Sequence, residues 1–282
     1  MKLDSSVRWE PGASDLTGTN VAIIGGTGGL GRAFARSLAA RGASVLVVGR
    51  TFRDADVPGI RFQQADLNLM REAERVAAEL PAETLDVVVF TTGIMAATSR
   101  QQTDEGIERD TAVSYLSRYV ILRSIAGRLR NGTRVFIMGM PGMGQTGSYD
   151  DLNAERSYKS MAVHSNTVAA NEALVLDAAE HYPGLRVFGL NPGIVKTAIR
   201  GNMLGEGSWR QKVLEGLIGL FTPSADTYAA RVVPLLTSPD LVRYTGVMFN
   251  RKAQAILPSP GLTQQHVDGF MTASAALAAK VS

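Results

Sequence analysis

The feature that most constrains the fold of this chain is the glycine-rich stretch GGTGGLG at residues 25–31. It follows the short apolar run NVAII and opens a segment with helical spacing, RAFARSLAARG, which Gly42 closes as a C-terminal cap. A second apolar run, SVLVVGR, comes next. In such a strand–turn–helix–strand unit, glycines permit a tight turn, let the backbone approach a pyrophosphate and aim the helix N-terminus at its charge. The stretch therefore predicts a dinucleotide site, with a purely structural glycine turn as the alternative.

The rest of the chain continues the alternation of apolar strands and helices. Further strands are expected in GIRFQQ, LDVVVFTTG, TRVFIMG and LRVFGLNPG, and helices in LMREAERVAAEL, DTAVSYLSRYVILRSIAGRL and NTVAANEALVLDAAEHY. No linker of low complexity and no repeat divides the 282 residues. The pattern predicts a single α/β domain over residues 1–282, a Rossmann-like doubly wound parallel sheet with helices on both faces.

Composition argues against several classes of function. The net charge is only +3, from 29 Lys and Arg against 26 Asp and Glu, and the basic residues are scattered, which argues against a nucleic-acid partner. There is no cysteine, and the three histidines, His164, His181 and His266, have no metal-ligand spacing, so no metal is expected. No long apolar stretch or leader-like segment is present, which predicts a soluble, cytoplasmic protein without a membrane partner.

The helix expected at 110–129 carries apolar residues nearly all round. These residues are Val113, Tyr115, Leu116, Tyr119, Val120 and Leu122. One face of this helix should pack on the sheet. The other faces predict either a contact between subunits of a homo-oligomer, a dimer or tetramer, or burial within the monomer, and both remain open.

The order and spacing of four motifs resemble the short-chain dehydrogenase/reductase family over about residues 17 to 250. The motifs are the glycine turn, ADL at 65–67, FTTG at 90–93 and NPGIVKT at 191–197. The resemblance implies that the cofactor pyrophosphate is bound by Gly25, Thr27, Gly29, Leu30 and Gly31. It implies an adenine contact at Asp66 and Leu67, a cofactor contact at Gly93, and a nicotinamide contact at Pro192, Gly193, Ile194 and Thr197.

The end of the second strand indicates which cofactor is bound. NAD enzymes place an acidic side chain there, on the ribose 2′-hydroxyl. This chain has Gly49 and Arg50 instead, and no carboxylate occurs before Asp54. The Arg50 guanidinium can pair with a 2′-phosphate, so NADPH is favoured over NADH. An ordinary solvated surface arginine is the alternative.

None of the four catalytic positions of the family holds its usual residue. The serine, tyrosine, lysine and asparagine of the family fall on Gly139, Ala162, Asn166 and Ser114. Two other tyrosines lie nearby, but Tyr158 has Ala162 four residues on and Tyr149 has Asn153, so neither restores the Tyr-x-x-x-Lys pair. We therefore expect both the tyrosine and the lysine of the family to be missing from the site.

Their loss limits the chemistry. Hydride transfer to a ketone produces an alkoxide, which the family's tyrosine protonates with its pKa lowered by the lysine. Without them, ordinary carbonyl reduction should be very poor. Three interpretations remain: a cationic iminium substrate, which becomes a neutral amine without a proton; a non-redox cyclase or isomerase that keeps the dinucleotide as pocket wall; and a non-catalytic NADPH-binding or sensor protein.

Intact cofactor motifs beside a lost acid resemble the fungal reductase/Diels–Alderases of this family, which act in the biosynthesis of paraherquamide and malbrancheamide indole alkaloids. The resemblance implies NADPH-dependent reduction of a cyclic iminium in an indole alkaloid precursor, followed by a stereocontrolled intramolecular cycloaddition. Those proteins place an aspartate at the lysine position, where it can pair with the substrate cation. Asn166 keeps the shape of that residue without its charge, and it is the candidate catalytic residue.

Two segments are candidates for the substrate site. The loop MGMPGMGQTGSYDDL after the fifth strand offers Met140 and Met143 as apolar walls for an indole, unless it is simply a mobile glycine-rich loop. The segment at about 198–222 is expected to form a substrate lid, with Trp209 and Met203 as candidate contacts. Packing within the protein is the alternative role for Trp209.

Overall fold

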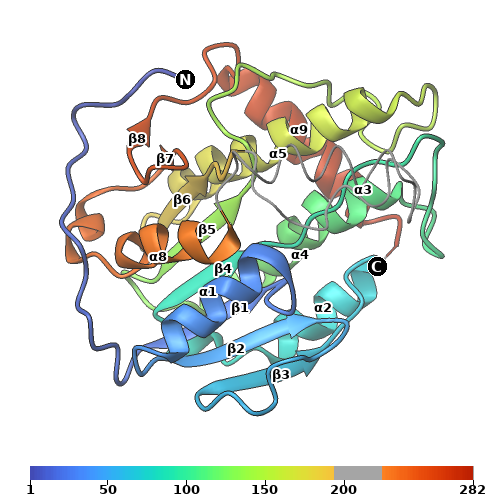
Figure 1. The fold of residues 1–282 in the computed structure, drawn as a ribbon. Helices are drawn as coiled ribbons and strands as arrows, with labels where there is room; N and C mark the ends of the chain where they lie inside the picture. Colours follow the sequence, from blue (N-terminus) through green and yellow to red (C-terminus); the bar gives the residue numbers. More distant parts are fainter. Residues whose placement is uncertain (194–223, 282) are drawn as a thin grey trace, which may run out of the picture.

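A computed structural model describes residues 1–193 and 224–281 of the chain. Its centre is an eight-stranded sheet in the order β3-β2-β1-β4-β5-β6-β7-β8 (Figure 1). The strands are β1 Asn20–Ile24, β2 Ser44–Gly49, β3 Ile60–Gln64, β4 Val87–Phe90, β5 Arg134–Met138, β6 Arg186–Leu190, β7 Val247–Phe249 and β8 Ala255–Ile256. Neighbouring strands are parallel throughout, except that β8 runs antiparallel to β7. The predicted doubly wound parallel sheet is confirmed.

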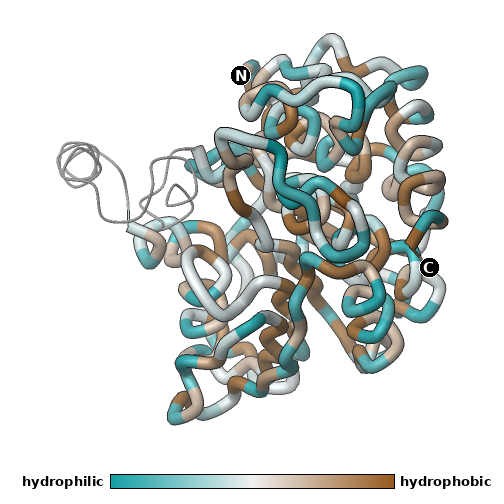
Figure 2. Tube along the Cα trace, turned by 90° about the vertical axis from the view of Figure 1, so that its right-hand side faces the viewer, coloured by the Kyte–Doolittle hydropathy of each residue, from teal (hydrophilic) through white to brown (hydrophobic). Residues whose placement is uncertain are grey.

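Helices cover both faces of the sheet (Figure 1). The helices are α1 Gly29–Ala39, α2 Met70–Glu79, α3 Arg109–Thr111, α4 Ser117–Ile125, α5 Ser160–His181, α8 Ala225–Leu236 and α9 Gln264–Ala278. Successive β1 side chains point to opposite faces, so Val21 and Ile23 pack with α1 and α8, whereas Ala22 and Ile24 pack with α2, α4, α5 and α9. The hydrophobic segments accordingly gather in the interior (Figure 2).

Shorter turns complete the described chain. They are the 3₁₀ turns η1 Ala82–Thr84, η3 Ala126–Arg128 and η5 Pro239–Arg243, and the π-helical turn η2 Ala112–Leu116. The helix expected at 110–129 is therefore interrupted by η2, which joins α3 to α4. Helix α5 begins at Ser160, six residues before the expected start at Asn166. The expected segment therefore omits the first six residues of α5, and Asn166 lies within the helix. None of the described helices is long and apolar enough to cross a membrane.

The apolar faces of α4 are buried within the chain itself. Helix α2 packs on α4, and α9 packs on α5. The Tyr115 hydroxyl of η2 is hydrogen-bonded to Ser274 Oγ of α9 at 2.5 Å. Of the six apolar residues singled out in the sequence, only Val113 is not buried. Burial within the monomer thus accounts for this pattern, and homo-oligomerisation stays a prediction without that support.

Candidate cofactor and substrate site

The glycine turn is shaped by close backbone approaches. Gly25 and Gly29 adopt left-handed φ values of +95° and +50°, which side chains disfavour. A Cβ atom added at Gly31 would lie 2.5 Å from the Gly25 carbonyl oxygen, and one at Gly25 would lie 2.5 Å from the Thr92 nitrogen. The first turn of α1 holds no acidic residue, and no described side chain caps it. The N-terminus of α1 is therefore left available to an anion such as a pyrophosphate.

The tightness of this turn can be tested on the protein without cofactor. We expect Gly31→Ala to lower the free energy of unfolding by about 1 kcal/mol or more, because the new methyl group would overlap a backbone oxygen. Gly28→Ala is the matched control, since a Cβ atom there would meet nothing within 4 Å. Urea unfolding of the two variants measures the difference. Equal stabilities would show that the turn has room for a side chain.

The residues at the end of β2 lie beside this turn. A Cβ atom added at Gly49 would lie 2.6 Å from Thr27 Oγ1, so Thr27 packs directly on the strand end. Leu30 is partly buried against the α1 and α8 core. The next residue, Arg50, is exposed, and its guanidinium forms no ion pair with any described residue. Its charge is therefore available to a ligand.

A hollow of about 600 Å³ opens beside Arg50. It is lined by Arg50, Asp66, Asn68, Leu69, Gln101, Gln102, Thr103, Asp104 and Arg109. Two of the predicted cofactor residues, Arg50 and Asp66, thus lie on one hollow. Leu67 is instead buried in the core, so that any contact it makes with an adenine comes from its backbone.

The other end of the predicted cofactor site is described only in part. Pro192 is buried, and Gly193 has a φ of +64° with its N–H donated to Asn191 Oδ1 at 2.9 Å. Gly93 follows β4 and is partly buried. Ile194, Thr197, Met203, Trp209 and the expected lid at 198–222 lie outside the described residues.

The first turns of α5 carry the two residues that stand at the expected tyrosine and lysine positions. Ala162 is exposed, and Asn166 Oδ1 accepts a hydrogen bond from the Ser148 backbone N–H at 2.9 Å. At Gly139, the expected serine position, an added Cβ atom would meet only ordinary contacts, the nearest being Asn171 Cβ at 3.4 Å. The packing at Gly139 would therefore accommodate a serine.

Neither Tyr158 nor Tyr149 is placed to act as the catalytic tyrosine expected at position 162. The Tyr158 hydroxyl donates to the Ala97 carbonyl oxygen at 2.6 Å. Burial and the negative charges of Glu108 and Asp110 raise the pKa of Tyr158, which is the opposite of what a proton-donating tyrosine needs. Tyr149 packs its ring edge against Phe270 of α9, with ring centroids 5.7 Å apart.

The loop after β5 is held by side chains along its length. Gly142 N–H donates to Glu172 Oε2 at 3.1 Å, and Gly144 N–H donates to Ser259 Oγ at 3.0 Å. With the bond from Ser148 to Asn166, three backbone groups of the loop are anchored. Within this loop Met140 is partly buried and Met143 is 46% exposed. The loop therefore offers an anchored wall, although its contact with a substrate stays a prediction.

Glu172 is the buried anchor of this loop, and its ionisation should make stability depend on pH. It accepts from Ser259 N–H at 2.6 Å and from Ser259 Oγ at 2.8 Å, and burial raises its pKa above the ordinary 4.5. A carboxyl with a raised folded-state pKa stabilises the fold at low pH and loses that contribution as the pH rises through the folded pKa.

We therefore expect the wild type to lose stability relative to Glu172→Gln as the pH rises above about 4.5. The difference in free energy of unfolding between the two proteins should change by roughly 1.4 kcal/mol for each unit by which the pKa of Glu172 in the folded state exceeds its pKa in the unfolded state. Urea unfolding of both proteins between pH 4 and pH 8 measures it. Parallel stability curves would show that Glu172 ionises as readily when folded as when unfolded.

The structure reveals a side-chain cluster that the sequence did not predict. Asp110 is fully buried and lies 2.9 Å from His164 Nδ1 and 2.5 Å from Ser114 Oγ. Ser114 Oγ also accepts from the Ile94 backbone N–H at 3.0 Å. From the sequence, His164 is considered only as a possible metal ligand, and no metal-ligand spacing surrounds it. Its partner is 54 residues away in the chain, so no local pattern could reveal the pair.

Arg118 is a second unpredicted feature. It is buried, and its guanidinium donates to the carbonyl oxygens of Thr92 and Met138 and, at 2.9 Å, to Asn171 Oδ1. Burial lowers its pKa to about 9. Thr92 and Met138 lie at or just beyond the ends of β4 and β5, so Arg118 joins the two strands at the edge where Gly93 and Gly139 follow.

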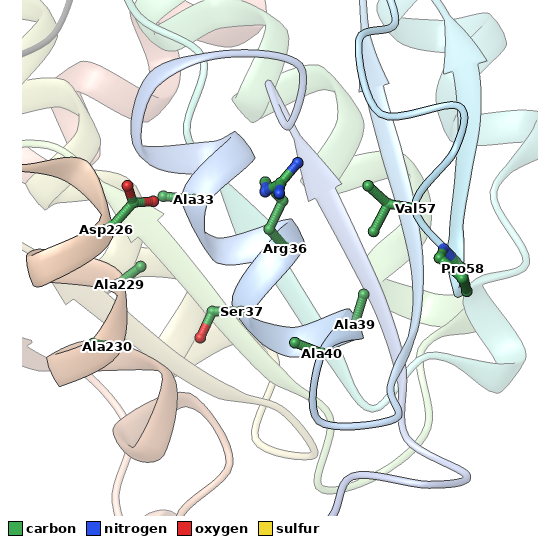
Figure 3. Close-up of a pocket in the computed structure, with 10 residues that line it drawn as sticks. All are labelled: Ala33, Arg36, Ser37, Ala39, Ala40, Val57, Pro58, Asp226, Ala229 and Ala230. Atoms are coloured by element: carbon green, nitrogen blue, oxygen red, sulfur yellow. The ribbon is translucent and has the colours of Figure 1, made fainter.

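A second hollow of about 600 Å³ lies between α1, α8 and the loop before β3 (Figure 3). It is lined by Ala33, Arg36, Ser37, Ala39, Ala40, Val57, Pro58, Asp226, Ala229 and Ala230. Small side chains of α1 and α8 face each other there, and the Arg36 guanidinium is bound to Asp54 at 2.9 Å. None of the predicted site residues lines this hollow, so we do not assign it to the candidate cofactor site.

Comparison with known proteins gives one consistent result. Residues 19–206 match the family model described as short chain dehydrogenase. The chain is 48% identical to an uncharacterized oxidoreductase of Saccharomyces cerevisiae, over 99% of this chain and 95% of the yeast protein. It is 27% identical to human retinol dehydrogenase 14, over 64% of this chain and 63% of that protein.

Solved structures agree with this similarity. A short chain dehydrogenase/reductase family protein superimposes with a TM-score of 0.62 at 26% identity, covering 84% of this chain and 96% of the other. A short-chain dehydrogenase/reductase from Serratia marcescens superimposes equally well, with a TM-score of 0.62 over 83% of this chain and 96% of the other. At 22% identity, the second similarity concerns the fold alone.

Proposed function

Because the chain belongs to the short-chain dehydrogenase family, we propose that it is an NADPH-dependent oxidoreductase that reduces cyclic iminium ions. One observation carries the proposal. A glycine turn shaped by close backbone approaches lies in the same fold as a helix α5 that carries Ala162 and Asn166 where the family's proton-donating pair is expected. The chain thus keeps the means to bind a hydride donor without the usual means to protonate an alkoxide.

Residues of the described structure fit the cofactor. The N-terminus of α1 can hold the pyrophosphate, and Arg50 and Asp66 on their common hollow can hold the adenosine end. The Arg50 guanidinium, which forms no ion pair with a described residue, supports NADPH over NADH. When bound, the nicotinamide supplies a hydride to the substrate carbon. The protein's own contribution is to orient both partners and to exclude water from them.

The substrate class follows from proton balance. A ketone that accepts hydride needs a proton on oxygen in the same step, and the hydroxyl of Tyr158 is committed to a backbone carbonyl with its pKa raised. An iminium carries its positive charge already and becomes a neutral amine on accepting hydride. The site therefore favours a substrate whose nitrogen needs no proton from the protein.

A substrate panel tests this proposal. Under identical conditions with NADPH, cyclic iminium ions should be reduced at least about 100-fold faster than simple ketones, which is the lower end of what a positioned proton donor contributes to ketone reduction. Oxidation of NADPH and identification of the amine product measure this. Robust ketone reduction would show that a proton donor is present after all. A protein that binds NADPH and reduces neither class would support the sensor or non-redox interpretation.

The cycloaddition and the indole alkaloid substrate remain separate predictions. They rest on the resemblance to the fungal reductase/Diels–Alderases, on Met140 and Met143 of the anchored loop, and on Trp209, which lies outside the described residues. A cycloaddition needs apolar walls that hold one folded conformer of the substrate rather than an acid or base. The described structure contains one of these candidate walls, the loop after β5.

A further inference from the structure

The cluster of Asp110, Ser114 and His164 borders the cofactor site. Helix α3 follows β4 and helix α5 follows β5, so both begin at the carboxyl edge of the sheet, where ligands of such folds bind. Ser114 lies in the π-helical turn η2, a local geometry that often marks functional positions. Its hydroxyl accepts from Ile94 N–H, directly after the predicted cofactor residue Gly93.

Hydrogen bonding fixes the roles within this cluster. Both oxygens of the fully buried Asp110 are occupied, Oδ1 by the Ser114 hydroxyl and Oδ2 by His164 Nδ1. Asp110 Oδ2 accepts from His164 Nδ1–H, and in a neutral imidazole whose hydrogen is on Nδ1 the other nitrogen, Nε2, is an acceptor. The His164 side chain is 21% exposed, and its Nε2 has no hydrogen bond to a described residue.

The charged side chains around Asp110 other than His164 have other hydrogen-bond partners. Arg118 is the nearby cation, but its N–H groups are donated to the carbonyls of Thr92 and Met138 and to Asn171. Glu108 is also buried, and its side chain accepts from the Thr111 N–H at the start of α3. No described lysine or arginine therefore forms a salt bridge with Asp110, and His164 is its partner.

We propose that His164 Nε2 accepts the N–H of a protonated imine, with Asp110 as the positioning residue that fixes the ring and supplies negative charge. This inference rests on the proposed iminium reduction and narrows its substrate to cations of the form C=N⁺–H. The hydride that a bound reduced nicotinamide would give up, with the electron pair of its own C–H bond, would form the new C–H bond at the imine carbon. The C=N π electron pair would become the nitrogen lone pair, and the proton would stay on nitrogen. An N-alkylated iminium offers no hydrogen to His164.

Two matched cations test the preference. For the wild type, kcat/KM for protonated 3,4-dihydroisoquinoline should exceed that for its N-methyl iminium by about ten-fold, the worth of one hydrogen bond to a charged group. His164→Gln and Asp110→Asn should reduce this ratio to near one. His266→Gln is the control, because the ring of that histidine is hydrogen-bonded to Thr263 at the exposed start of α9.

A spectroscopic readout separates recognition from a merely structural role. The chain has three histidines, so protein labelled with ¹⁵N-histidine gives few ring signals, and the loss of one set in His164→Gln assigns it. In the cofactor-free wild type, the N–H cation should shift the His164 Nε2 signal and the N-methyl cation should not.

The outcomes distinguish this inference from the function on which it rests. Equal kcat/KM for the two cations with an unmoved Nε2 signal would overturn the role of His164 while leaving iminium reduction intact. Reduction of neither cation would overturn the proposed function itself. Ketone reduction that disappears in His164→Gln would make His164 a proton donor and would overturn the inference in favour of carbonyl chemistry.

Discussion

Arg50→Ala should narrow the preference for NADPH over NADH by about ten-fold or more. A charge-assisted contact with a phosphate is worth roughly 1.5–3 kcal/mol, and the described structure offers the Arg50 guanidinium no competing ion pair. Because NADH lacks the 2′-phosphate, its affinity should change little. Fluorescence titration of both cofactors with the wild type and the variant measures the change.

Arg53→Ala is the matched control for this experiment. Arg53 is also exposed and lies three residues further along the same loop, but it does not line the hollow that Arg50 and Asp66 share. It should leave the cofactor preference unchanged. A wild type that binds NADH as tightly as NADPH would remove the argument from Arg50 altogether.

Asn166→Asp should raise kcat/KM for a cyclic iminium by about ten-fold. A carboxylate near a partly buried cation stabilises it more than a neutral amide does. The structure adds a reason to expect a folded variant, since an aspartate oxygen can still accept from Ser148 N–H. Hydride transfer discharges the cation, so tighter ground-state binding opposes the gain, but we expect binding and positioning to prevail.

Two further substitutions separate charge from loop anchoring at this position. Asn166→Ala removes the acceptor for Ser148 N–H without adding charge, and Asn166→Lys replaces it with a cationic donor that cannot accept. Both should loosen the loop after β5, and only the lysine should also repel a cation. Stopped-flow measurement of hydride transfer gives the rates. An aspartate variant no faster than the alanine variant would count against a role for charge.

Introducing both a tyrosine at position 162 and a lysine at position 166 is not expected to recreate the catalytic site of the family. Residues of α5 near the expected tyrosine and lysine positions make hydrogen bonds of their own. Asn166 anchors Ser148, and Asn171, one and a half turns further along the helix, binds Arg118 and the Ser114 carbonyl oxygen at 2.8 Å. Ala162→Tyr combined with Asn166→Lys would therefore restore the residues without restoring their surroundings.

Local sequence patterns were enough to predict the elements that carry the cofactor turn. The strands from β1 to β6 were each expected within the correct stretch, because buried parallel strands are continuous apolar runs between turn residues. The left-handed φ of Gly25 and the close approach at Gly31 follow from the same spacing of glycines. The strands β7 and β8 were not predicted because they are only three and two residues long, and the helices α8 and α9 were not predicted either.

The sequence by itself thus determined the family, the sheet and the dinucleotide turn, since each depends on residues adjacent in the chain. Only the tertiary structure decided what surrounds the positions where the catalytic residues of the family are expected. The pair of Asp110 and His164, the buried Arg118 and the anchoring of the loop by Asn166 and Glu172 all join residues 18 or more positions apart. Such contacts are set by how helices pack on the sheet, and no periodicity along the chain encodes which side chains then meet.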